Sequence, residues 1–219
     1  MDTFQQHEIF EIEVLEVLKN TRILEPLVFG GGTMLRLCFD LKRYSADLDF
    51  WFVKSISEDD FFSKIRKILG DRYDLVDAQL KHYTLLLEIR STNYPKRLKI
   101  EIRREITECD FQDRIAFSTY SNKQVLLRAH TLEQTMKNKI EAIIERGEPR
   151  DGFDIEFILR KGIPLPKLSD IQKLTLITRI KKFKDNDFKV KLGSILESDL
   201  RRYYIENRFS YLMEKLNEL

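Results

Sequence analysis

The sequence predicts an α/β protein in which a mixed β-sheet with flanking helices is followed by a helical C-terminal domain. Two observations predict the sheet: helical and strand-like segments alternate near the N-terminus, and a run of three strand-like segments follows them. A third predicts the second domain, because capped helices dominate from about residue 130 onward. We therefore expect an α/β domain over residues 1–125 and a helical domain over residues 126–219.

Each expected element has a local signal. Apolar residues on one side predict the first helix, and a short apolar run before glycine predicts a buried strand. Ser57 with Asp60 and Thr131 with Gln134 are typical of helix starts. The expected order is a helix at 4–19, a strand at 27–29, a helix at 33–41, a strand at 47–53, a helix ending at Gly70, strands at 73–80, 83–89 and 98–106, and helices from 131, 151 and 169, with one or two more after 191.

Composition narrows the class of protein. Hydrophobic residues make up 42% and charged residues 34%, which indicates a packed core and not a disordered chain. The net charge of +2 argues neither for nor against a nucleic-acid partner. Two cysteines form no disulfide framework, and we see neither a signal peptide nor an apolar membrane span. We expect a cytoplasmic protein with no membrane partner.

Two aspartates open the predicted strand at 47–53. Alternate residues of a strand point to the same face, so Asp47 and Asp49 share one face while Leu48 and Phe50 point into the core. Converging carboxylates repel each other unless a positive charge lies between them. A divalent cation supplies that charge, and a pair of ions suits phosphoryl transfer. The plainer alternative is that both acids lie at an exposed strand end and bind nothing.

A glycine turn precedes this pair of acids. Gly31, Gly32 and Thr33 join a strand to a helix, where backbone N–H groups and the helix dipole can hold triphosphate oxygens. The Thr33 hydroxyl and the Arg36 charge could add to such a site. Alternatively, this is only a tight turn that requires positive φ. The turn and the acids together are more specific than either motif alone.

A third carboxylate could complete the site. Glu101 lies between Ile100 and Ile102, so it faces away from the core. If its strand adjoins 47–53, Glu101 could bind a second metal ion or accept the proton of an attacking hydroxyl. Otherwise it is a cross-strand partner of an arginine such as Arg103.

The helical domain contains a further candidate cluster. Asp151 and Asp154 share a face in the first turn of a helix, where the helix dipole favours acids. Lys139 could reach a β- or γ-phosphate, and Asp151 could hold that lysine or contact the nucleotide. Alternatively, both aspartates are ordinary N-terminal helix acids.

Taken together, these motifs resemble nucleotidyltransferase-fold proteins and, more narrowly, the AbiEii/AbiGii toxin family. The most specific block is G-G-T-x-L-R followed by R-x-S-x-D-L-D-F, and the I-E-I at 100–102 and the later Lys139 and Arg150-Asp151 motifs are shorter. The resemblance implies a minimal nucleotidyltransferase domain. It also implies metal ligands at Asp47, Asp49 and Glu101, phosphate-binding residues at Gly31, Gly32 and Thr33, and later motif residues at Lys139 and Asp151.

The resemblance also implies an enzyme that uses Mg²⁺ to transfer NMP from an NTP to an acceptor hydroxyl. The implied acceptor is the 3′ end of tRNA, and the implied role is a toxin with a cognate antitoxin protein. Basic stretches at 137–139, 179–184 and 201–204 could bind an RNA backbone, although such stretches are often only solvated. Two alternatives remain: transfer to a small-molecule or protein hydroxyl, and a nucleotide-binding module without turnover. The sequence identifies neither the NTP nor the role of residues 160–219.

Overall fold

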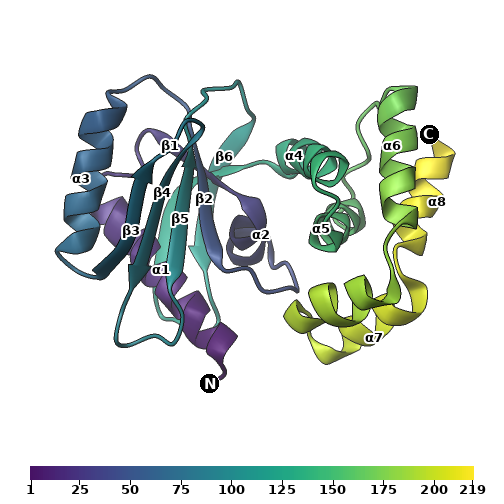
Figure 1. Cartoon of the computed structure of the whole chain (residues 1–219), viewed down its shortest axis with the longest axis horizontal. Coiled ribbons are helices and arrows are strands. Elements are labelled where there is room, and N and C mark those ends of the chain that lie inside the picture. The colour runs from purple at the N-terminus through teal and green to yellow at the C-terminus, as the bar shows by residue number, and fades with distance from the viewer. The chain divides into compact units, whose positions relative to one another are not determined.

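The computed structural model describes all residues, 1–219, and divides the chain into two compact units (Figure 1). The first, which we call the sheet unit, comprises Met1–Asp40 and Tyr44–His130. The second, the helical unit, comprises Leu41–Arg43 and Thr131–Leu219. The boundary therefore follows His130 and not residue 125. The reason is that the strand β7, Gln124–His130, continues the sheet across the expected boundary.

The sheet unit is a seven-stranded mixed sheet with three helices, which confirms the predicted α/β class. The strand order is β3-β4-β5-β2-β1-β7-β6. The β2–β5 and β1–β7 pairs are parallel and the others are antiparallel. The elements are α1 Thr3–Asn20, β1 Leu27–Gly30, α2 Gly31–Phe39, β2 Asp47–Phe52, α3 Glu58–Gly70, β3 Asp74–Leu80, β4 Thr84–Arg90, β5 Leu98–Arg103, β6 Phe111–Phe117 and β7.

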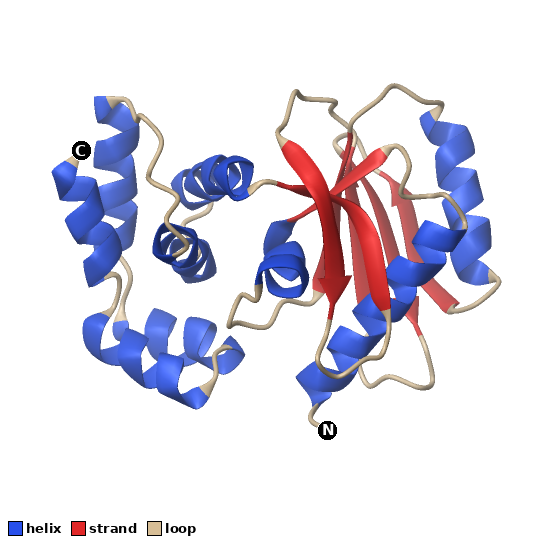
Figure 2. Ribbon diagram, turned by 180° about the vertical axis from the view of Figure 1, so that it is seen from behind, coloured by secondary structure: helices blue, strands red, loops and turns tan.

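One face of the sheet forms the core of this unit. Leu48, Phe50 and Phe52 of β2 are buried, whereas the alternate residues of the strand are half-buried. Phe52 meets Phe61 of α3 edge to face at 5.1 Å, and Figure 2 shows α1 crossing the sheet. Burying each such side chain stabilises the fold by roughly 1.5–3 kcal/mol. The opposite face of β2 and β5, which we call the polar face, carries the half-buried Asp47, Asp49, Lys99 and Glu101.

The helical unit contains five α-helices. Its core is partly aromatic, because Phe209 contacts the rings of Phe183, Phe188 and Tyr204. Ser169 and Gln172 form the reciprocal capping box of α6, at the position where a helix from 169 was expected. The elements are α4 Leu132–Glu145, α5 Pro149–Arg160, α6 Asp170–Lys181, a π-helical turn at Asp187–Leu192, a 3₁₀ turn at Gly193–Ile195, α7 Ser198–Asn207 and α8 Ser210–Glu218.

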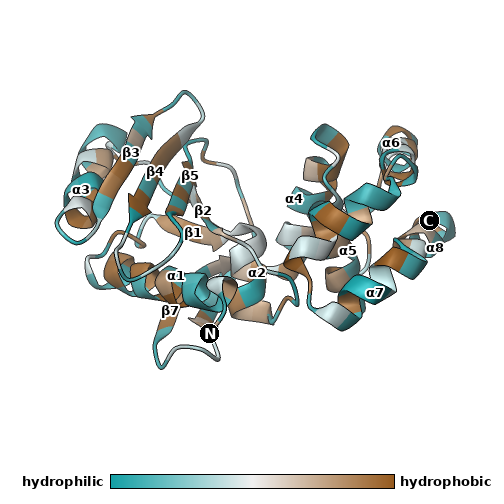
Figure 3. Ribbon diagram, turned by 60° about the horizontal axis from the view of Figure 1, so that its bottom comes forward, coloured by the Kyte–Doolittle hydropathy of each residue, from teal (hydrophilic) through white to brown (hydrophobic).

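Hydropathy follows these elements (Figure 3). Hydrophobic stretches run along the strands, while the helices carry hydrophobic and hydrophilic residues side by side. Such amphipathic helices bury one stripe and expose the other. None of the helices combines the length and the apolar character that a bilayer crossing would require.

Candidate active site

The acidic residues of β2 and β5 lie next to each other on the polar face. The two strands run parallel, and their register places Asp49 directly opposite Glu101 and Asp47 opposite Lys99. The structure thus meets the condition on which the predicted role of Glu101 depended. Asp47 and Glu101 are about one-third exposed, at 37% and 36% of their side-chain surfaces. These carboxylates are therefore accessible to a ligand from solvent.

A lysine lies between two of these acids. The Lys99 ammonium is 2.9 Å from Glu101 Oε1 and 3.5 Å from Asp47 Oδ2. Burial alone would lower the pKa of Lys99, but the hydrogen bond to Glu101 and the charge of Asp47 outweigh it and raise that pKa. Lys99 was not among the predicted site residues, although its position two residues before Glu101 puts it on the same face.

The carboxylates of Asp47, Asp49 and Glu101 are of the kind that binds a divalent metal, but their side chains do not surround a common point. No group of three or more His, Cys, Asp or Glu side chains in the 219 residues is arranged to hold a metal ion. Instead, the Lys99 ammonium is the cation that balances Asp47 and Glu101. Carboxylate oxygens are the ligands that Mg²⁺ prefers, and the lysine occupies a position suited to a cation. Metal binding by Asp47, Asp49 and Glu101 therefore stays a prediction, and a metal held by Asp47 and Glu101 would have to displace Lys99.

The glycine turn lies against Asp49. Gly30, the last residue of β1, pairs with Asp49 in the antiparallel β1–β2 register. Gly31 begins α2 with a φ of +75°, and a Cβ atom built there would lie 2.2 Å from Asp49 Oδ2. Only glycine fits this position, for both its backbone conformation and its contact. The N-terminus of α2, the positive end of the helix dipole, therefore adjoins an acid of the polar face.

Two residues predicted to assist phosphate binding are engaged with α1. Thr33 is fully buried, and its hydroxyl donates a hydrogen bond of 3.4 Å to Glu11. Burial, with the nearby charge of Glu8, raises the pKa of Glu11 well above its usual range. Arg36 binds Glu8, and its guanidinium lies 4.1 Å from the centre of the Tyr44 ring. Phosphate binding by Thr33 and Arg36 stays a prediction.

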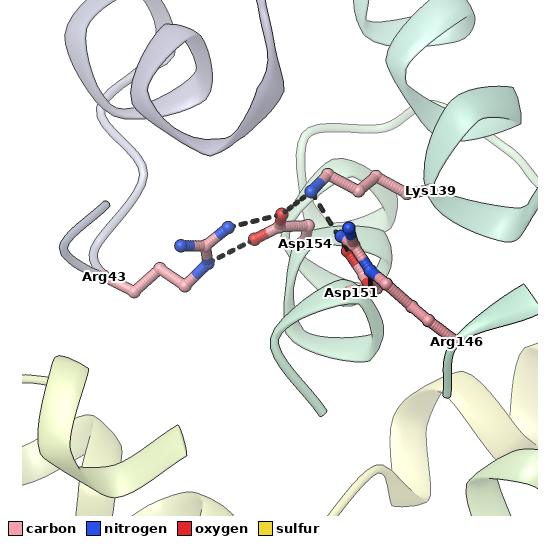
Figure 4. Close-up of polar contacts among 5 residues, drawn as sticks. All are labelled: Arg43, Lys139, Arg146, Asp151 and Asp154. Atoms are coloured by element: carbon pink, nitrogen blue, oxygen red, sulfur yellow. Dashed lines mark hydrogen bonds and ion pairs between the residues drawn. The ribbon is translucent and has the colours of Figure 1, made fainter. Parts of the chain in front are cut away.

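The later motif residues form a buried network of ion pairs in the helical unit (Figure 4). Arg43 forks onto Asp154 with hydrogen bonds of 2.6 and 2.7 Å. The Lys139 ammonium lies 2.7 Å from Asp154 and 3.1 Å from Asp151. Arg146 forks onto Asp151 at 2.8 and 2.7 Å. Three cations thus share two carboxylates, and both aspartates are fully buried.

These contacts determine the charge state of Asp154. Burial alone would raise the pKa of Asp154, but the charges of Arg43 and Lys139 outweigh it and the pKa is lowered. Asp154 is therefore ionised at neutral pH. The contact between Asp151 and Lys139 matches one of the two roles predicted for Asp151, which was to hold that lysine. Arg146, which follows the last residue of α4, was not among the predicted site residues.

Comparisons with known proteins identify a family and a fold for the chain. A sequence model of the family described as nucleotidyl transferase AbiEii toxin, type IV toxin–antitoxin system, matches residues 14–210. No curated protein matches the chain. Among solved structures, a proposed nucleotidyltransferase from Helicobacter pylori is similar in fold, with 19% identity, a TM-score of 0.56 and 96% of each chain covered. JHP933 from Helicobacter pylori is also similar, with 20% identity, a TM-score of 0.52 and coverage of 95% of this chain and 94% of that one.

Proposed function

The chain belongs to the family of AbiEii nucleotidyltransferase toxins of type IV toxin–antitoxin systems, and we propose that it transfers NMP from an NTP to the 3′-terminal hydroxyl of a tRNA. The observation that carries the proposal is the contact between the glycine turn and the acids. Gly31 adjoins Asp49, and Asp49 pairs with Glu101 across two parallel strands. A helix N-terminus beside neighbouring carboxylates suits a nucleoside triphosphate.

The proposed chemistry is a single displacement at the α-phosphorus. The acceptor oxygen forms a bond to that phosphorus, the bond to the bridging oxygen breaks, and pyrophosphate leaves. Bound divalent metal would neutralise the charge that develops on the phosphate oxygens. The N–H groups at the start of α2 hold phosphate oxygens, and Glu101 accepts the proton that the attacking hydroxyl loses.

Under this proposal the helical unit contributes a positive charge for the triphosphate. Asp151 holds Lys139, whose ammonium offers a positive charge for a β- or γ-phosphate. Membership in a toxin–antitoxin family also supports a cognate antitoxin as the protein partner. The tRNA acceptor, the metal and the roles of the individual residues are parts of this proposal.

The experiment incubates the full-length protein with each α-labelled NTP, Mg²⁺ and total tRNA. We expect label in tRNA, pyrophosphate release, and loss of both with Asp49→Asn. Asp59→Asn, which alters an exposed acid in the first turn of α3, is the matched control and keeps full activity. Label that moves to a protein or small-molecule acceptor would refute the tRNA assignment. Absence of pyrophosphate with every acceptor would refute transfer altogether.

A further inference from the structure

A cavity of about 350 Å³ opens in the helical unit, lined in part by Lys42 and Phe153, the chain neighbours of Arg43 and Asp154. Its walls are largely aromatic and apolar. It is lined by Phe153 and Phe157 of α5, Leu200, Tyr203 and Tyr204 of α7, and the basic residues Lys42 and Arg160. Ligand-binding clefts begin at about 300 Å³, so the cavity is large enough for a flat ring system with part of its attached group.

The charged residues that line the cavity favour an anionic ligand. No lining residue is acidic, while Lys42 and Arg160 are cationic. Arg160 is held in place, because it donates a hydrogen bond of 3.0 Å to the Tyr203 hydroxyl and lies 4.5 Å from the centre of the Tyr211 ring. Its side chain is still 46% exposed, so part of the guanidinium can meet a ligand. Flat aromatic walls beside cations suit a nucleobase that is attached to a phosphate.

The walls of this cavity are positioned in advance. Leu41–Arg43 belongs to the helical unit, and the forked Arg43–Asp154 pair anchors this segment on α5. Lys42, the neighbour of Arg43, and Phe153, the neighbour of Asp154, therefore line the same cavity. On the other wall, the Tyr204 hydroxyl donates a hydrogen bond of 2.8 Å to the buried Glu156. A site whose walls are already ordered loses little conformational entropy when it binds.

We propose that this cavity binds one unpaired nucleotide of the RNA acceptor, with the base against the aromatic walls and the phosphate at Arg160 and Lys42. The inference rests on the proposed function for the identity of the acceptor as RNA. It also gives residues 160–219 a role in acceptor binding. Tyr203, which is 37% exposed, is the ring most available for stacking.

The test measures binding and needs no turnover. Fluorescence anisotropy follows a labelled single-stranded oligoribonucleotide with the full-length protein, without NTP or Mg²⁺. Tyr203→Ala should weaken binding about tenfold, the loss expected when one base loses its stacking partner. Tyr203→Phe keeps the ring and loses only the hydroxyl that holds Arg160, so it should weaken binding less than Tyr203→Ala. Tyr83→Ala, which removes a 75% exposed tyrosine of the sheet unit, is the matched control and should change nothing.

A second variant tests the cavity without relying on Tyr203. Leu200→Trp fills the space and should weaken oligoribonucleotide binding by a similar factor. Lys42→Gln should make binding less dependent on salt, by about one unit in the slope of log K against log salt concentration. Equal affinities for Tyr203→Ala, Leu200→Trp and Tyr83→Ala would overturn the inference.

A competition experiment distinguishes the two ligands that could supply a base with a phosphate, namely RNA and a free nucleotide. The oligoribonucleotide is displaced with AMP, with ATP and with unlabelled RNA. Displacement by RNA at far lower concentration than by either mononucleotide supports the acceptor site. Binding of ATP that depends on Tyr203, together with oligoribonucleotide binding that does not, would overturn the inference in favour of a free-nucleotide site. RNA binding that depends on Tyr203 in a protein that transfers no label would leave this inference standing while the proposed function fails.

Discussion

Replacing Lys99 with glutamine should strengthen the binding of a divalent metal to the polar face. In the structure the Lys99 ammonium bridges Glu101 at 2.9 Å and Asp47 at 3.5 Å. A metal ion that uses these carboxylates has to break both contacts. Lys99→Gln removes the competing cation and leaves the acids in place. The change therefore separates competition by the lysine from the ability of the acids to bind a metal.

The expected magnitude follows from the exposure of the three side chains. Lys99 is 38% exposed, and its two partners are exposed to a similar extent. Ion pairs at this exposure contribute about 0.2–1 kcal/mol each, so the two contacts together oppose metal binding by about 1 kcal/mol. Since 1.4 kcal/mol corresponds to a tenfold change in affinity, we expect metal binding about fivefold tighter in Lys99→Gln. The gain should shrink as the salt concentration rises.

The assay is titration of the protein with Mn²⁺, followed by the loss of the free-ion paramagnetic resonance signal. Lys64→Gln on α3 has the same change in charge at an exposed site and serves as the control. An affinity in Lys99→Gln that equals or falls below that of the control would refute the idea that Lys99 competes with a metal. Loss of all Mn²⁺ binding in Asp49→Asn would show that the titration reports on the polar face.

Three further predictions test other parts of the structure. Asp154→Asn should lower the free energy of unfolding by about 3–5 kcal/mol, because it leaves buried cations without their partner, whereas the exposed Asp74→Asn should cost at most about 1 kcal/mol in the same urea titration. Gly31→Ala should abolish nucleotidyl transfer and cost at least 1–2 kcal/mol, since its Cβ meets Asp49 and its φ is positive, whereas Gly70→Ala has open space and should be tolerated. Burial lowers the pKa of His130 from 6.5 to about 4, so the unfolded chain binds the proton more tightly and the free energy of unfolding falls as the pH falls. Between pH 7.5 and 4.5 this group should lower the free energy of unfolding by about 2.5 kcal/mol. In urea titrations at the two pH values, the decrease should be smaller by that amount in His130→Phe.

The faces of the strands could be predicted from sequence because they depend on local alternation. In β2 the buried residues Leu48 and Phe50 alternate with the aspartates as the period of two requires. The same period in β5 placed Glu101 on the polar face, and the strand pairing then brought it to Asp49. The fold class and the turn at Gly31 followed from similarly local signals.

Other features depend on contacts that local patterns do not encode. β6 was not predicted from the sequence. It is an edge strand whose apolar residues Phe111, Ile115 and Phe117 are exposed, and only Ala116 is buried, so its sequence lacks the pattern of a strand with one buried apolar face. The fork between Arg43 and Asp154 joins residues 111 positions apart. Sequence spacing within the helical domain predicted only that Asp151 and Asp154 share a face. It could not identify the arginines that balance them.

The balance of charge in the ion-pair network bears on the role predicted for Lys139. Each aspartate accepts two hydrogen bonds from its own arginine, Asp154 from Arg43 and Asp151 from Arg146. Lys139 is shared between the two carboxylates and is the surplus cation of the network. If its ammonium moved toward a phosphate, both aspartates would keep a forked arginine, whereas loss of Arg43 would leave Asp154 with a single monodentate partner. The arginines therefore act as the fixed part of the network, and Lys139 is the cation whose departure would disturb the network least, as the role predicted for it requires.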